Sequence, residues 1–145
     1  MTPNECVLCT TTGGELIAQA KHFRVVRALD QPQFPMTYRV IWNTHVAEFS
    51  DLSATERHLC SDALAWLETA MRRFLSPDKM NLAELGNVVP HLHWHVIARY
   101  QWDSTFPAPV WALAVRDVNP EKWHALAAQQ LELEVYLREN GHQFA

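Results

Sequence analysis

Three of the eight histidines stand at alternate positions within Pro90–Ile97, and this stretch limits the possible folds more than any other. In a β-strand successive side chains point to opposite faces of the sheet, so His91, His93 and His95 would share one face. The other face would be apolar, because it collects Leu92, Trp94, Val96 and Ala98. The alternation therefore predicts a strand that is buried on one side and carries imidazoles on the other.

The imidazole face of this strand has several chemical uses. A helix would scatter the three rings around its circumference, whereas a strand places neighbouring ones about 7 Å apart at the backbone. Such an array can bind a metal ion, bind phosphate, or use one ring as a nucleophile or base. A histidine-rich edge strand without chemistry is the plainest alternative, and the interleaved Leu, Trp and Val argue against it.

The bulk composition narrows the class of protein. The 145 residues suit one domain, and 48% hydrophobic with 19% charged residues is ordinary for a globular chain. A net charge of -4 gives no electrostatic reason to expect binding to a nucleic-acid polymer. No apolar run approaches the roughly 20 residues that span a membrane, and no basic segment precedes an apolar one at the N-terminus, so we expect a cytoplasmic protein.

Short β-prone runs and two helical patterns follow one another along the chain. Ser53 and Glu56 have the spacing of a capping box, which predicts a long amphipathic helix that ends at Ser76-Pro77. Asn119-Pro120 and Gly141 bracket a last helix at about 119–140. Besides the histidine strand, we expect strands at residues 15–20, 23–28, 37–42 and 80–85. This order predicts an α+β domain with an antiparallel five-stranded sheet and helices on one side.

The histidine stretch, His91-Leu92-His93-Trp94-His95-Val96-Ile97, resembles the signature of the histidine-triad (HIT) superfamily. The likeness extends from about Cys6 to Tyr100 and includes an early CxxC, an Asp before a Pro-containing turn, a long helix and a Gly-polar pair before the triad. It implies one HIT domain over residues 1–145, with a core at about 6–111 and a helical extension at about 119–140.

The resemblance also implies an activity. HIT proteins of this kind are nucleotide hydrolases and transferases that act at an α-phosphate, usually as homodimers. By position in the motif, His93 would be the nucleophile that forms a nucleotidyl-histidine. His95 would hydrogen-bond the phosphate oxygens and, when protonated, stabilise the developing charge. Asn87 stands where the family has a polar residue near the phosphate or leaving group, and Asp30 where it has an acidic residue that accepts from the ribose hydroxyls.

A metal site is the second implication. Cys6, Cys9, His45 and His91 match in number and type the ligands of a tetrahedral zinc, and the set resembles that of zinc-containing HIT proteins and the related galactose-phosphate uridylyltransferases. Because protein would fill all four positions, such an ion would be structural. The alternative is that the two cysteines are free thiols and that His91 only orients its neighbour. No organic cofactor is expected.

We therefore expect a hydrolase of dinucleoside polyphosphates or nucleoside phosphoramidates. A nucleotidylyltransferase is the nearest alternative, although transferases of the superfamily tend to carry Gln where this chain has His95. Two other classes stay open: a metalloenzyme in which His91, His93 and His95 hold one catalytic metal, and a nucleotide-binding regulatory protein with little turnover. Loss of metal on replacing His93 would indicate the first. Tight mononucleotide binding without a covalent intermediate would indicate the second.

Overall fold

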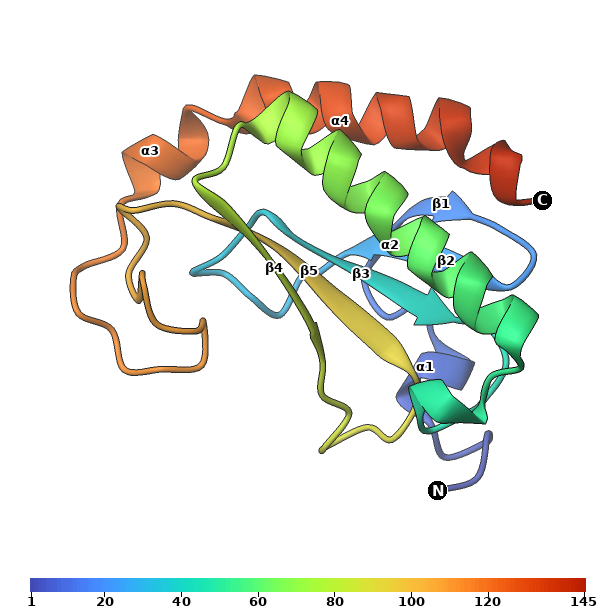
Figure 1. The fold of residues 1–145 in the computed structure, drawn as a ribbon. Coiled ribbons are helices and arrows are strands. Elements are labelled where there is room, and N and C mark those ends of the chain that lie inside the picture. The colour runs from blue at the N-terminus through green and yellow to red at the C-terminus, as the bar shows by residue number, and fades with distance from the viewer.

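All 145 residues are described by a computed structural model, in which five antiparallel strands form one sheet with helices against one of its faces (Figure 1). The strand order is β1-β2-β3-β5-β4, so the histidine strand lies inside the sheet between β3 and β4. The predicted α+β class is confirmed. The strands are β1 (Glu15–Gln19), β2 (Phe23–Arg27), β3 (Thr37–Trp42), β4 (Lys79–Glu84) and β5 (His93–Arg99).

The long helix α2 (Ala54–Leu75) lies across the sheet beside α4 (Ala127–Asn140), as Figure 1 shows. Its start is the predicted capping box: Ser53 Oγ accepts from the backbone N–H of Glu56, and the Glu56 carboxylate accepts from the backbone N–H of Ser53. These bonds satisfy two N–H groups that a helix start would otherwise leave without partners. The helix ends where Ser76 adopts a left-handed conformation, one residue before Pro77, as predicted.

The last helix differs from the prediction, because the structure divides it into α3 (Pro120–His124) and α4. Trp123 in α3 is buried against the rings of Tyr100 and Trp102, with ring centroids 5.5 and 4.6 Å apart. Leu133 and Leu137 in α4 belong to the same core, where α4 packs against α2 and β1. The two segments are therefore anchored at different parts of one core, and the chain bends between them. Gly141 follows α4 at the predicted position, within a short 3-10 helix, η2 (Gly141–Phe144).

The hydrophobic core fills the space between the sheet and the helices. Leu92, Val96 and Ala98 are buried in it, and Trp94 packs against its edge, so the predicted apolar face of the histidine strand is confirmed. Two further short helices lie outside this layer: α1 (Val7–Thr10), which holds the second cysteine of the CxxC, and η1 (Phe49–Asp51). None of the helices combines the length and the apolar character that crossing a membrane requires.

Helix α4 is joined to the sheet by a buried carboxylate. Glu134 accepts hydrogen bonds from Arg27 Nε at 2.7 Å and from the Tyr38 hydroxyl at 2.9 Å. Burial, followed by the neighbouring Glu134 charge, raises the pKa of Tyr38, so that its hydroxyl stays protonated and donates. Tyr38 therefore serves the helix side of the sheet and takes no part in the histidine face.

A buried ion pair fixes the segment that follows β5. Arg99 Nε and Nη2 donate to the two carboxylate oxygens of Asp103 at 2.8 and 3.0 Å, and both residues are only 1% exposed. Burial alone would raise the pKa of Asp103, but hydrogen bonds from Arg99 and from the backbone outweigh it and lower that pKa. The segment after β5 is thus held against the sheet by charge as well as by its aromatic rings.

Candidate active site and metal centre

His93 and His95 lie on the sheet face opposite the helices, where both line a cavity of about 780 Å³. Their ring centroids are 5.1 Å apart. The other walls come from the N-terminal segment, the turn after β2 and the loop before β5. The strand alternation that predicted an imidazole face therefore places two of the three rings in one open cavity.

The orientation of His93 is set by the backbone. Its Nδ1 lies 2.6 Å from the carbonyl oxygen of His91, which can only accept, so Nδ1 carries the proton and Nε2 keeps a free lone pair. Burial lowers the pKa of His93, so the ring is neutral near pH 7. A neutral imidazole whose other nitrogen is held by an acceptor is a competent nucleophile.

His95 has a different electrostatic environment. Burial, and after it the positive charge of Arg39, lowers the pKa of His95 to about 4. The resting side chain is therefore neutral at pH 7 and offers one N–H donor. A neutral His95 cannot supply the positive charge that was predicted for its protonated form. In the resting site another group has to supply that charge.

The two other predicted substrate contacts, Asp30 and Asn87, line the same cavity as the histidines. The Asp30 side chain is 65% exposed, and both of its carboxylate oxygens accept from Arg39 Nη2, at 2.8 and 3.0 Å. Asn87 follows Gly86, whose φ of +67° is a left-handed conformation that glycine adopts without strain. The structure thus brings together the four residues that were predicted to act on substrate.

Arg39 is a cavity residue that the sequence reasoning did not single out. It stands opposite His95 in the pairing of β3 with β5, and it is only 9% exposed. A signal was present in the sequence, because Arg39 is the one charged residue in the strand Thr37–Trp42, all of which is buried. A charge inside a fully buried strand needs a specific partner and often marks a functional site.

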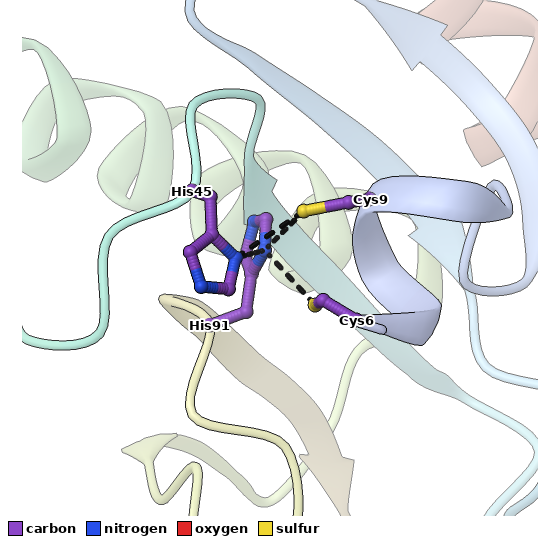
Figure 2. A group of neighbouring side chains, drawn as sticks. All are labelled: Cys6, Cys9, His45 and His91. Atoms are coloured by element: carbon purple, nitrogen blue, oxygen red, sulfur yellow. Dashed lines mark hydrogen bonds between the residues drawn. The ribbon is translucent and has the colours of Figure 1, made fainter. Parts of the chain in front are cut away.

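The predicted metal ligands converge beside this cavity (Figure 2). Cys6 and Cys9 come from the start and interior of α1, His45 follows β3, and His91 lies just before β5. His91 Nδ1 is 3.4 Å from each sulfur, and His45 Nδ1 is 3.2 Å from Cys9 Sγ and 3.2 Å from His91 Nδ1. In a tetrahedron with bonds of about 2.0–2.3 Å, neighbouring ligand atoms lie about 3.3–3.8 Å apart. The four side chains fit a zinc ion.

The second nitrogen of His91 supports this interpretation. Nε2 donates to the Trp42 carbonyl at 2.6 Å, which leaves Nδ1 unprotonated and facing the sulfurs. Burial also lowers the pKa of His91, which favours the neutral ring that binds metal. Since both ring nitrogens are engaged away from the cavity, His91 cannot share a catalytic metal with His93 and His95. The three-histidine metalloenzyme hypothesis does not fit this geometry.

Arg24 holds the N-terminal segment beside the Cys2His2 cluster, and it is a second residue that the sequence reasoning did not single out. This residue of β2 donates to the carbonyl oxygens of Leu8 at 2.6 Å and Thr12 at 2.9 Å, and to Asn43 Oδ1 at 3.2 Å. Burial lowers the pKa of Arg24, and the neighbouring side chains of Cys9 and Cys6 partly oppose this shift. The cysteine segment is therefore tied to the sheet by hydrogen bonds as well as by the four convergent side chains.

Two histidines in a cavity on the open face of an antiparallel sheet, with a Cys2His2 cluster at its edge, define a histidine-triad domain. The model of the HIT domain family matches residues 13–102, and the chain belongs to this family. No functionally curated protein matches it.

Solved structures share the fold. A histidine triad protein from Marinobacter aquaeolei is 26% identical with a TM-score of 0.67, over 87% of this chain and 92% of that one. One from Bradyrhizobium japonicum is 24% identical with a TM-score of 0.64, over 82% and 91% respectively. A Zn-bound histidine triad family protein from Mycobacterium smegmatis is 20% identical with a TM-score of 0.63, over 93% and 99%.

Proposed function

We propose that this HIT protein is a nucleotide hydrolase that cleaves at the α-phosphate of dinucleoside polyphosphates or nucleoside phosphoramidates. The observation that carries the proposal is the neutral ring of His93, held through Nδ1 by the His91 carbonyl, in a cavity that also contains Asp30, Asn87 and His95. These groups supply a nucleophile, donors for phosphate oxygens and an acceptor for ribose hydroxyls.

The first step forms a bond between His93 Nε2 and the α-phosphorus. The bond from phosphorus to the leaving oxygen or nitrogen breaks, and its electron pair departs with that atom, which takes up a proton. The proton on His93 Nδ1 stays on that nitrogen, which donates it in a hydrogen bond to the His91 carbonyl, so the ring is positively charged while phosphorus is bound to it. Water then attacks phosphorus, and the bond from phosphorus to His93 Nε2 breaks with its electron pair returning to the nitrogen. The water gives up a proton to solvent, which balances the one that the leaving group took up, and a nucleoside monophosphate and the neutral imidazole result. Donors from His95 and Asn87 bind the phosphate oxygens during both steps.

Intact-mass spectrometry tests this mechanism. The protein is mixed briefly with adenosine dinucleotide polyphosphate or adenosine phosphoramidate and quenched at alkaline pH. We expect wild type to gain the mass of one nucleoside monophosphate, and His93→Ala to gain none. His142→Ala is the matched control, because His142 is an exposed histidine near the C-terminus, and it should form the adduct.

Other outcomes would favour the alternatives. If no adduct forms and no mononucleotide is released with several bases, the hydrolase proposal is wrong and a nucleotide-binding regulatory protein becomes the better interpretation. A nucleotidylyltransferase would form the adduct but discharge it onto an added phosphate acceptor faster than onto water.

We also infer that Cys6, Cys9, His45 and His91 bind a structural zinc ion. The convergence of two sulfurs with two imidazole nitrogens supports this, because these are the ligand atoms that zinc prefers and one of the nitrogens, His91 Nδ1, has a free lone pair. When bound, the ion would join the N-terminal segment to the sheet beside His93. Thiolate ligands persist in a reducing compartment, which supports a cytoplasmic location.

Metal analysis of purified variants tests the zinc site. We expect one zinc per chain in wild type and a large loss in Cys9→Ser. Cys60→Ser is the control, since Cys60 is buried in α2, where burial raises its pKa to about 11 and keeps it a thiol. Equal zinc content in all three proteins would contradict the assignment.

A homodimer is the assembly that we propose. β4 is an edge strand, and Leu82 on it and Leu85 just beyond it are exposed. An edge strand with apolar side chains is a site for pairing with another chain. Light scattering on the eluted protein should give twice the 16.7 kDa of one chain. Leu82→Lys should shift that mass towards the monomer, and an unchanged monomeric mass in wild type would exclude the dimer.

A further inference from the structure

Arg39 occupies the floor of the cavity between two groups with expected substrate contacts. Its side chain pairs with Asp30 on one side, and its strand position is opposite His95 on the other. Arg39 also lines the same cavity as the rings of His93 and His95. The residue therefore lies between the expected ribose and phosphate positions.

The hydrogen bonds of Arg39 are incomplete. A guanidinium has five N–H groups, and this one uses only Nη2, towards Asp30. Its Nε is buried and has no hydrogen-bond partner. A buried donor without an acceptor is rare in folded proteins and indicates a place that a ligand atom can satisfy.

The charge balance of the cavity leads to the same residue. Among the side chains that line it, Arg39 is the one formal cation and Asp30 the one formal anion. An anionic substrate group that lies over the two imidazoles would find no other fixed positive charge there. Arginine suits this task, because its planar fork matches phosphate oxygens and it does not lose its proton.

We propose that Arg39 is a phosphate-binding residue of this site, which donates to an oxygen of the nucleotide's α-phosphate while its ion pair orients Asp30 towards the ribose. The inference rests on the proposed function. It assigns the fixed positive charge of the site to Arg39 on β3, whereas His95 supplies only a hydrogen bond. The site would then discriminate strongly between a nucleoside 5′-monophosphate and its parent nucleoside.

Isothermal calorimetry tests this with AMP, GMP, CMP and UMP, each beside its parent nucleoside, and the base that binds best is kept. The readout is the ratio of nucleotide affinity to nucleoside affinity. We expect Arg39→Gln to lower that ratio by about tenfold or more, since a hydrogen bond to a charged group has about that effect. Arg39→Lys, which keeps the charge, should restore part of it and also guards against a misfolded Gln variant.

Two controls separate the roles. Arg27→Gln removes an ion-paired arginine on the helix side of the sheet and should leave the ratio unchanged. Asp30→Asn should weaken the nucleoside at least as much as the nucleotide, because Asp30 would contact the ribose and its replacement leaves the Arg39 charge free for the phosphate. If Arg39→Gln binds both ligands as wild type does, or weakens both equally, the inference is wrong while the proposed function stands. If wild type binds no mononucleotide, both are wrong.

Discussion

Replacing Glu134 tests whether the C-terminal helix belongs to the same cooperative domain as the sheet. Glu134→Leu removes the acceptor of two hydrogen bonds, from Arg27 and from Tyr38. The Tyr38 hydroxyl is fully buried and would be left without a partner, which costs about 1–3 kcal/mol. The Arg27 side chain is 32% exposed, so water screens its ion pair with Glu134, and the loss of that pair costs about 0.5–1 kcal/mol.

The two contributions together predict a loss of about 1.5–4 kcal/mol in the free energy of unfolding, which is large against a typical total of about 5–15 kcal/mol. Urea titration followed by tryptophan fluorescence and by far-UV circular dichroism measures it. We expect one coincident transition that moves to lower urea. Glu134→Gln keeps one acceptor oxygen and should be affected less.

A double-mutant cycle provides the stricter test. Tyr38→Phe removes the hydroxyl that Glu134→Leu would strand, so the double variant should be about 1–2 kcal/mol more stable than the sum of the single effects. Strict additivity would refute the buried hydrogen bond as the source of the loss. A transition that does not move while helix content falls would show that α4 folds as a separate unit, and the single-domain prediction would be wrong.

Three further predictions concern other parts of the molecule. The pKa of His95 is lowered to about 4, against about 6.5 for an unfolded histidine, so the folded state binds fewer protons between these values. The free energy of unfolding should therefore fall by about 1–2 kcal/mol as pH falls from about 6.5 to 4, after allowance for the partial exposure of the ring. Urea titrations at several pH values measure this, and His95→Gln should lose this part of the pH dependence. Asp103→Ala leaves the Arg99 charge buried and should destabilise by about 3–5 kcal/mol by the same titration; a loss below about 1 kcal/mol would contradict the ion-pair argument. Gly14→Ala should lower the thermal midpoint by several degrees, because the new Cβ would overlap the Arg27 carbonyl at a φ of +154°, and an unchanged midpoint would mean that the turn rearranges freely.

The histidine strand and the long helix show what local sequence can predict. In β5 and the residue before it, large apolar side chains alternate with other residues, and a strand can bury them only on one face. The core face was therefore foreseeable from Leu92, Val96 and Ala98. The start of α2 was foreseeable from Ser53 and Glu56 because capping is local chemistry. The convergence of Cys6, Cys9, His45 and His91 was foreseeable through their residue types and the family pattern.

The position of Arg39 beside His95 could not be foreseen in the same way. Its relation to His95 arises because β3 pairs directly with β5, although the whole of α2 and β4 separates them along the chain. No local pattern encodes which strands become neighbours. The division of the last helix has a similar cause, since Trp123 packs on rings from a distant segment and local capping signals do not record that contact.

The position of β5 between two partner strands limits how its sequence can change during evolution. It is paired on both edges, with core residues on one face and His93 and His95 on the other. A single inserted or deleted residue within it would exchange the two faces, placing imidazoles in the core and apolar side chains in the cavity. We therefore expect length changes to be excluded from this strand and to accumulate in the loops that flank it, whereas its apolar residues can be exchanged for others of similar size.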